Sequence, residues 1–306
     1  MVRIQADGYD VNMLSYLHGF HAGNAADVLK HSVLIFCLDY LKKKEKPLLC
    51  VDTHAGTGFY DLSETANPPN REWEKGIGRL LQSAGDLPPM IAGYLRLCGD
   101  QAQRGLPGGY PGSPVIMARE LGRGDRLVCF ELHPREFESL KVSMEKVRGE
   151  GNPTTEVRQE DGPAGLKSLL PPPSRRGLVL IDPSWEDQDE YESIPRAVQS
   201  SLRRFPEGTF IIWYPLLVLP KDKTAVPPSL PEILFGLSDG KRSCTELRLE
   251  LCTGTPVNSP RGMYGSGLVI YNPPWTLKPA AEEALPFLAK VLGGEEGNWR
   301  LEYVDK

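Results

Sequence analysis

The feature that most constrains the fold of this chain is a series of short apolar runs, each of which breaks off at an acidic residue. Helix-like segments separate the runs, and in the first of these segments Asn24 is a candidate N-cap. The acids that end the runs are Asp52, Glu131, Asp161 and Asp182. Nearly unbroken apolar strands that alternate with helices are typical of a parallel sheet covered on both faces. The sequence therefore predicts an α/β fold.

The same pattern predicts a mostly parallel, Rossmann-like sheet of seven strands with one insertion. The strand-like runs fall at residues 48–52, 126–131, 154–161, 176–182, 208–216, 244–251 and 265–272. A helix around residues 280–291 is expected to end the chain. Residues 59–110 are rich in glycine, proline and asparagine between short helical pieces, and we interpret them as a helical insertion subdomain. In open α/β sheets, ligands bind beyond the carboxyl ends of the strands, so the four acids are expected to meet a ligand.

Composition narrows the class of protein. The formal net charge of −5 argues against indiscriminate nucleic-acid binding, although a local basic face stays compatible with it. No apolar stretch approaches the ~20 residues that span a bilayer, and the N-terminus lacks the layout of a signal peptide, so a cytoplasmic protein is expected. The six cysteines are scattered without a C-x-x-C pair, which favours reduced core thiols over disulfides, and no metal site is expected.

The turn HAGTG at residues 54–58 follows the first acid and allows a ligand to approach the backbone closely. It is not a phosphate loop, because G-K-[ST] is absent and the third glycine of G-x-G-x-x-G is missing. Glu131 is a candidate to hold ribose hydroxyls, although it could equally cap the helix that begins near Pro134. Asp161–Gly162 could likewise be a plain turn. A nucleoside cofactor without a pyrophosphate fits this set better than NAD, and S-adenosylmethionine is such a cofactor.

The stretch DPSW after the fourth strand has the shape of the signature of amino-methyltransferases. An exocyclic purine amine is a poor nucleophile because its lone pair is delocalised into the ring. The Asp182 carboxylate and the Pro183 carbonyl could accept its two N–H bonds, while Trp185 stacks on the extruded base. The structural alternative is a helix cap by Asp182 and a packed Trp185. The similar NPPW at residues 272–275 follows the last strand, away from the switch point of the sheet, and we interpret it as a strand terminator.

Several motifs in this order resemble the RlmJ-type 23S rRNA adenine-N6 methyltransferases. They are MLSYLHGFHAGNAADVLKHSV from Met13, VDTHAGTG, YPGSP, FELHP, the Asp161–Gly162 turn, SRRGLVLIDP and VIYNPPW. The resemblance implies a class I methyltransferase domain over residues 13–58 and 111–306, with residues 1–12 as an N-terminal extension. It implies S-adenosylmethionine as cofactor and N6-methylation of one adenine of 23S rRNA, adenine 2030. The enzyme is expected to act as a monomer on RNA that is free or in early assembly.

The resemblance also assigns roles by position. The residues implied to contact the cofactor are Lys30, His31, His54, Ser113, Glu131, Asp161 and Gly162. Asp182 is implied as the catalytic residue, and Tyr16 as a contact to the substrate RNA near the incoming base. The family's motif is normally Asp-Pro-Pro-aromatic, so Ser184 is a departure that bears on substrate geometry.

Two other functions stay open at this point: a DNA adenine-N6 methyltransferase, and a non-catalytic RNA-binding assembly factor with the same fold. The absence of a dedicated sequence-reading domain disfavours the first, and Ser184 is the one feature that favours the second. The insertion is expected to contact RNA outside the active site. Basic side chains hold RNA phosphates, and we expect Arg175, Arg176 and the run Lys42–Lys46 to form that phosphate surface.

Overall fold

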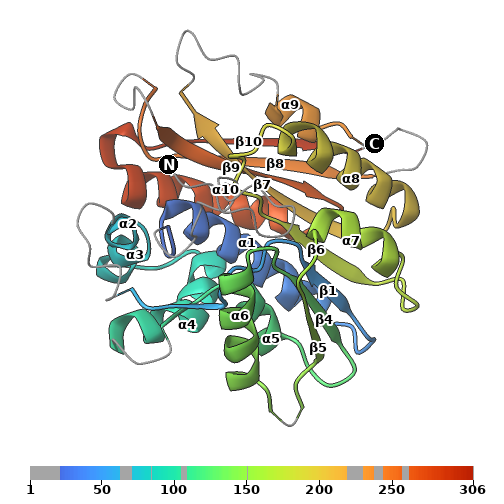
Figure 1. The fold of residues 1–306 in the computed structure, drawn as a ribbon. Helices are drawn as coiled ribbons and strands as arrows, with labels where there is room; N and C mark the ends of the chain where they lie inside the picture. The colour runs from blue at the N-terminus through green and yellow to red at the C-terminus, as the bar shows by residue number, and fades with distance from the viewer. Residues whose placement is uncertain are drawn as a thin grey trace, which may run out of the picture.

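The computed structural model describes residues 21–62, 71–83, 85–104, 109–149, 151–218, 230–237, 244–256 and 262–305. Tyr16 and the predicted N-terminal extension at residues 1–12 lie outside these ranges. In the part of the chain that is described, the elements alternate between strands and helices as predicted, and they form three layers with the sheet in the middle (Figure 1).

The central sheet has eight strands in the order β10-β8-β9-β7-β6-β1-β4-β5. The strands are β1 (Leu49–Asp52), β4 (Arg126–Phe130), β5 (Thr154–Arg158), β6 (Gly177–Ile181), β7 (Thr209–Leu217), β8 (Glu246–Cys252), β9 (Met263–Tyr271) and β10 (Asn298–Val304). The five strands from β5 to β7 are mutually parallel, and β9 runs antiparallel between β7 and β8. The strand order reverses on either side of β1, which places a switch point at the carboxyl ends of β1 and β6.

The sequence prediction was wrong about the number of strands and the end of the chain. After the last long helix, β10 pairs antiparallel with β8 along its full length, from Asn298 to Val304. Its sequence NWRLEYV mixes apolar and charged residues, and Trp299 and Tyr303 are exposed at the edge of the sheet. An edge strand of this kind buries only part of its side chains and lacks the unbroken apolar run that marks the central strands.

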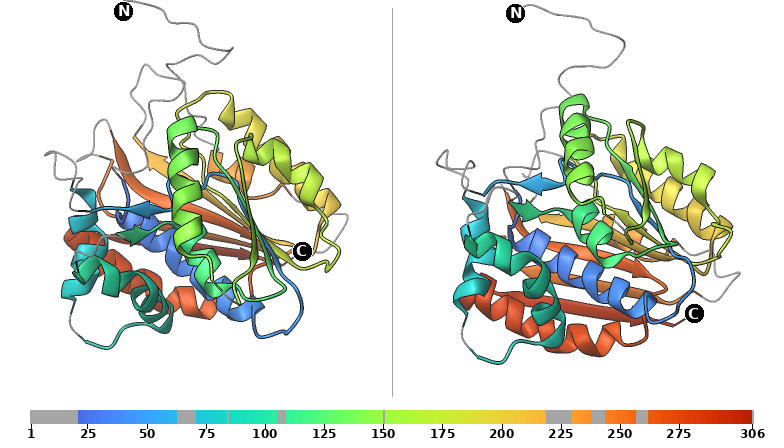
Figure 2. Two further views of the ribbon diagram at one scale, coloured as in Figure 1. Left: turned by 60° about the horizontal axis from the view of Figure 1, so that its bottom comes forward. Right: turned by 90° about the horizontal axis from the view of Figure 1, so that it is seen from below.

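Helices cover both faces of the sheet (Figure 2). One face carries α1 (Ala25–Leu41), α4 (Pro89–Arg104), α5 (Ser113–Glu120), α6 (Pro134–Lys146) and α10 (Leu277–Leu288), which continues as η3 (Ala289–Gly293) and η4 (Gly294–Glu296). The other face carries α7 (Gly162–Leu169), α8 (Glu190–Arg204) and α9 (Leu230–Leu234). Two apolar cores result, one on each side of the sheet.

The segment predicted as an insertion contains α2 (Glu72–Lys75), α3 (Ile77–Gln82) and α4, and its two ends meet. Phe59–Tyr60 (β2) pairs antiparallel with Tyr110–Pro111 (β3). Apolar side chains of α3 and α4 belong to the same core as α1 and α10. Because the segment shares that core, it is fixed to the sheet domain rather than packed around an apolar centre of its own.

Helix α1 begins as the sequence predicts. The Asn24 side chain accepts hydrogen bonds from the backbone N–H groups of Ala26 (2.9 Å) and Asp27 (3.0 Å). This N-cap satisfies two of the donors that every helix start leaves without a partner. Within the described ranges, none of the helices combines the length and the apolarity needed to cross a bilayer. All six cysteines are free thiols, as predicted, and only Cys252 is not fully buried.

Candidate active site

A cavity of about 1200 Å³ opens at the carboxyl ends of β1, β4 and β6, next to the switch point. Its lining includes every residue predicted to contact the cofactor: Lys30, His31, His54, Ser113, Glu131, Asp161 and Gly162. Asp182 lines it as well. The structure thus brings the predicted residues together from six segments of the chain, while their roles in binding stay predictions. Small-ligand pockets typically occupy about 300–1,000 Å³, so this cavity has room for a cofactor and part of a second molecule.

The glycine turn after β1 is held by bonds to both neighbouring strands. The Thr53 N–H donates to the Leu180 carbonyl at 3.1 Å, and the Ala55 N–H donates to the Phe130 carbonyl at 2.9 Å. Gly56 has a φ of +60°, in the left-handed region that glycine adopts without strain. Its N–H points to Glu131 and donates to Oε2 at 2.8 Å. The turn is therefore fastened to the acid that follows the next strand.

Glu131 is not the cap of α6, which was the alternative from the sequence. The N-cap of α6 is His133, whose ring nitrogen accepts from Glu136, whereas Glu131 accepts from the His133 N–H at 2.7 Å through Oε1. Burial raises the pKa of Glu131 against these backbone donors, which favour the ionised form. Each oxygen still has a lone pair after accepting one bond, so the carboxylate can accept from a ligand in the cavity.

Asp161 and Gly162 start α7 at the rim of the cavity. Asp161 is the N-cap, and its Oδ1 accepts from the Ala164 N–H at 2.9 Å. A Cβ added to Gly162 would lie 2.2 Å from the Thr53 carbonyl oxygen, so only glycine allows α7 to approach the first turn this closely. The pair is therefore the start of a helix rather than a plain turn, and both residues line the cavity.

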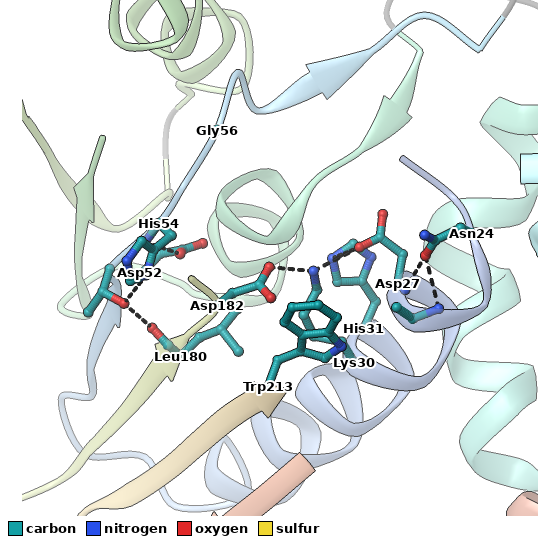
Figure 3. Close-up of polar contacts among 12 residues, drawn as sticks. Asn24, Asp27, Lys30, His31, Asp52, His54, Gly56, Leu180, Asp182 and Trp213 are labelled. Carbon is teal, nitrogen blue, oxygen red and sulfur yellow. Dashed lines mark hydrogen bonds and ion pairs between the residues drawn. The ribbon is translucent and has the colours of Figure 1, made fainter. Parts of the chain in front are cut away.

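Asp182 follows β6 and forms a buried ion pair with Lys30 of α1 (Figure 3). Lys30 Nζ lies 2.5 Å from Asp182 Oδ2 and 2.8 Å from Asp27 Oδ1, and the lysine is 2% exposed. Burial lowers the pKa of Lys30, but the two carboxylates outweigh that effect and raise it above its ordinary value, so the ammonium stays charged. Asp182 Oδ1 accepts no hydrogen bond from the residues that the structure describes.

The helix-cap alternative for Asp182 does not hold. Helix α8 begins at Glu190, its N-cap position is Asp189, and the Asp182 carboxylate is bonded to α1 instead. A carboxylate with one oxygen fixed by a buried cation and the other free, at the edge of a cavity, is a hydrogen-bond acceptor in a defined direction.

Three further titratable groups surround the ion pair. Burial raises the pKa of Asp52 to about 7, the Ser113 side chain opposes this shift, and the charge of Asp182 adds to it. Asp52 is fully buried, and its Oδ2 has no hydrogen-bond partner among the described residues. Burial lowers the pKa of His54 to about 4, so this imidazole is neutral at pH 7. His31 is buried with its Nδ1 2.8 Å from the Tyr110 hydroxyl.

Trp185 differs from its predicted role as a stacking surface. The residue is 4% exposed, and its Nε1 donates to the Trp213 carbonyl at 3.0 Å. Its ring packs against Tyr191, whose hydroxyl donates to the Trp185 carbonyl at 3.0 Å. The backbone adopts a φ of +57°, which is strained for a residue with a side chain. In this structure the indole therefore fixes the DPSW loop to the core and does not face an incoming base.

Pro183 and Ser184 complete the loop. Pro183 is buried and is not among the residues that line the cavity, and no described residue donates to its carbonyl oxygen. Ser184 lines the cavity, and its Oγ accepts from the Glu186 N–H at 3.4 Å. This bond forms a short turn at the position where a second proline would restrict the backbone through its fixed φ.

The second motif, NPPW, lies at the amino ends of the parallel strands, whereas Asp182 lies at their carboxyl ends. Because β9 is antiparallel to β7, Tyr271 is paired with Phe210 near the start of β7. The Asn272 amide donates to the carbonyls of Pro206 and Gly208, at 2.7 Å each, so it ties together two chain turns. This placement confirms that NPPW lies away from the switch point.

The basic surface predicted for RNA also lies at the amino ends of the parallel strands. Arg176 precedes β6, and its guanidinium donates to the backbone carbonyls of Leu41, Lys44 and Lys46, closing the connection between α1 and β1. Arg175 pairs with Glu207 at 2.5 Å. These arginines support loops at the amino ends of the strands, so the surface they were expected to form is remote from the cavity.

Sequence reasoning missed two residues beside Asp182. Asp27 had no predicted role, yet it is 1% exposed and forms an ion pair with Lys30. Trp213 follows Ile212, the partner of Ile181 in the parallel ladder, so it occupies the position next to Asp182 on the neighbouring strand (Figure 3). The spacing of Asp27 and Lys30, one helical turn apart, is the signal that could have identified the first.

The sheet order, the glycine turn joined to an acid, and the cavity at the switch point define a Rossmann-like methyltransferase. Residues 45–305 match the family described as "Ribosomal RNA large subunit methyltransferase D, RlmJ", and the chain belongs to this family. It is 40% identical over 295 residues to "Ribosomal RNA large subunit methyltransferase J" of Haemophilus influenzae, covering 95% of this chain and 99% of the relative. It is 36% identical over 280 residues to the protein of the same name from Escherichia coli, covering 92% and 94%.

Among solved structures, a protein of Legionella pneumophila has the same fold over nearly its whole length. The TM-score is 0.79 with 33% identity, and the match covers 92% of this chain and 98% of that one. The expected methyltransferase fold is thereby confirmed, with eight strands in place of seven.

Proposed function

We propose that the protein transfers a methyl group from S-adenosylmethionine to the N6 amine of one adenine in 23S rRNA, adenine 2030 by resemblance to its family. The observation that carries the proposal is the Asp182 carboxylate, which is paired with a buried ammonium through Oδ2 and offers Oδ1 at the edge of the cavity. The relatives are named as methyltransferases of large-subunit ribosomal RNA, which supports RNA as the substrate.

The residues of the cavity fit S-adenosylmethionine. Glu131 offers a carboxylate fixed by two backbone donors, which suits the paired hydroxyls of a ribose. Asp161 and Gly162 line the cavity where they could contact the adenine of the cofactor, and Lys30, His31 and Ser113 line it for the amino-acid end. The cofactor supplies an electrophilic methyl group on a sulfonium. Its positive charge suits a cavity whose charged lining side chains are mostly acids.

The chain's own residues orient the amine rather than deprotonate it strongly. The amine directs one N–H to Asp182 Oδ1 and the other to the Pro183 carbonyl, which favours a pyramidal nitrogen with an available lone pair. The bound cofactor would supply the methyl group, whose bond to sulfur breaks as its bond to nitrogen forms. The N–H proton directed at Asp182 Oδ1 would leave the amine through that carboxylate to solvent. Such positioning accounts for most of the acceleration in a transfer of this type. Lys30 holds Oδ2 of Asp182 and so fixes which oxygen is presented.

The experiment that tests this function measures methyl transfer from labelled S-adenosylmethionine to unmodified 23S rRNA. We expect the wild type to label the RNA, and Asp182→Asn to lose transfer by at least about 100-fold while it still binds the cofactor. Trp275→Ala is the matched control from the second motif, because Trp275 is 75% exposed at the amino ends of the parallel strands; it should transfer at the wild-type rate.

Two alternative functions predict different results in the same assay. A DNA adenine methyltransferase would label unmethylated DNA in preference to RNA. A non-catalytic assembly factor would bind both ligands without labelling either.

We place the activity in the cytoplasm, where the protein would meet 23S rRNA as a monomer before or during early assembly. Because phosphate contacts release counterions, binding of an rRNA fragment should weaken as salt is added.

A further inference from the structure

Asp27 is a buried acid beside the proposed catalytic site, and no contact to cofactor or base accounts for it. It lies in the first turn of α1 and is 1% exposed. Its Oδ1 is 2.8 Å from Lys30 Nζ, and its Oδ2 accepts from the Gly23 N–H at 2.9 Å. A buried carboxylate is costly to desolvate unless it is paired, and here both oxygens are engaged on opposite sides.

We propose that Asp27 is a positioning residue for methyl transfer, which holds the Lys30 ammonium between two carboxylates so that Asp182 keeps Oδ1 free for the amine. The inference rests on the proposed role of Asp182. Asp27 does not line the cavity, whereas its ion-pair partner Lys30 does, so Asp27 acts through Lys30.

The geometry gives a reason for two carboxylates. An ammonium paired with a single carboxylate is free to move between its oxygens or to bridge both. Asp27 draws Lys30 Nζ from the side of α1, and the contact of 2.5 Å is then made with Asp182 Oδ2 alone. With Lys30 at +1 and two carboxylates at −2, the group carries a net charge of −1. Asp182 therefore keeps negative charge to attract the N–H of the amine.

The second oxygen of Asp27 joins this group to the insertion. Gly23 donates its N–H to Asp27, and its carbonyl accepts from the Ile77 N–H at 2.9 Å, at the start of α3. A Cβ added to Gly76 would lie 2.0 Å from the Gly23 carbonyl oxygen, so Gly76, between α2 and α3, packs in direct contact with the Gly23 backbone. Glu72 of α2 accepts from the Asn24 amide at 3.0 Å.

These contacts form one continuous path from the insertion to the catalytic carboxylate, through Gly23, Asp27 and Lys30. A displacement of α2 and α3 would move Gly23, and through it the oxygen that holds Asp27 in place. The insertion thus fixes the position of the ion pair as well as filling the core around α1.

The test is Asp27→Asn, which keeps the size of the side chain. Its amide oxygen can still accept from the Gly23 N–H, while its NH₂ group faces Lys30 Nζ and cannot accept from it. We expect kcat for transfer to 23S rRNA to fall about 10- to 100-fold, with Kd for S-adenosylmethionine changed less than about threefold. A kcat within twofold of the wild type would overturn the inference.

A double-variant cycle separates positioning from a general loss of structure. If Asp27 acts only through Lys30, adding Asp27→Asn to Lys30→Met should not lower kcat further. Losses that multiply in the double variant would refute the proposed path. If Asp182→Asn transfers methyl groups at the wild-type rate, the proposed role of Asp182 fails, and this inference fails with it. If Asp182→Asn is inactive while Asp27→Asn is normal, only this inference fails.

The chain provides a matched control in Asp125→Asn. Asp125 is also a buried acid, 4% exposed, and accepts from the backbone N–H groups of Leu48 and Gly122 and from the Lys42 ammonium. It lies before β4, at the opposite edge of the sheet from the cavity. We expect this variant to lose stability at least as much as Asp27→Asn and to keep the wild-type kcat. An equal loss of kcat in both variants would assign the effect of Asp27 to stability alone.

Discussion

Replacing Glu131 with glutamine separates the cofactor contacts of this acid from its structural contacts. In the wild type the carboxylate accepts from the Gly56 N–H at 2.8 Å and from the His133 N–H at 2.7 Å. Glutamine offers one oxygen, so one of these two bonds is lost and an NH₂ group faces a backbone donor. Hydrogen bonds to a charged group contribute about 1.5–3 kcal/mol each. Burial raises the pKa of Glu131, so the neutral amide also removes a desolvation penalty.

The two effects on stability oppose one another, and we expect the free energy of unfolding to change by no more than about 2 kcal/mol. Cofactor binding has no such compensation, because a ribose would lose a charged acceptor for two hydroxyls. The expected loss is about 2–4 kcal/mol, or about a 30- to 1,000-fold rise in Kd. Calorimetric titration with S-adenosylmethionine measures it, and unfolding in urea measures stability. A Kd within threefold of the wild type would refute the assignment of Glu131 to the ribose.

Substitutions at two other residues test the electrostatics and the strain of the site. Because burial raises the pKa of Asp52 from 3.8 to about 7, wild-type stability should fall as pH rises from about 4 to 7. Asp52→Asn removes this dependence. Its free energy of unfolding, measured in urea titrations relative to the wild type, should rise across that pH window by up to about 4 kcal/mol. Parallel plots of unfolding free energy against pH for the two proteins would contradict the pKa shift. Trp185→Ala should lose about 3–5 kcal/mol of stability. Trp185→Gly should lose about 1 kcal/mol less, because glycine tolerates the φ of +57°; a glycine variant less stable than the alanine variant would show that the strain is unimportant.

The sequence was sufficient to predict most of the elements that build the site. The central strands are recognisable because they are buried on both faces and read as unbroken apolar runs, and the glycine turn and Glu131 follow directly from their ends. Asn24 identifies the start of α1 because N-capping is a local interaction between residues two and three apart. Local chemistry of this kind is visible in a single sequence.

The features that escaped prediction depend on contacts between distant segments. Strand β10 is stabilised by β8, more than forty positions earlier in the chain, and its own sequence carries only a weak pattern. Trp185 has the residue type expected of a stacking surface, but its burial is set by Trp213 and Tyr191. The proposed role of Asp27 depends on Lys30, which also pairs with Asp182 on another element. In the sequence Arg176 resembles a solvent-exposed charge, whereas in the structure its guanidinium donates to backbone carbonyls at the end of α1 and in the segment after it.

The function of Asp182 is tested most directly by identifying the methylated nucleoside. After reaction of unmodified 23S rRNA with S-adenosylmethionine and the purified protein, the RNA is digested to nucleosides. The nucleosides are separated by liquid chromatography and identified by mass spectrometry. An acceptor aimed at an exocyclic amine predicts N6-methyladenosine as the product of the wild type and its absence with Asp182→Asn. Methylation at a ring nitrogen, a carbon or a ribose oxygen, or the same yield from both proteins, would show that the carboxylate does not hold the amine.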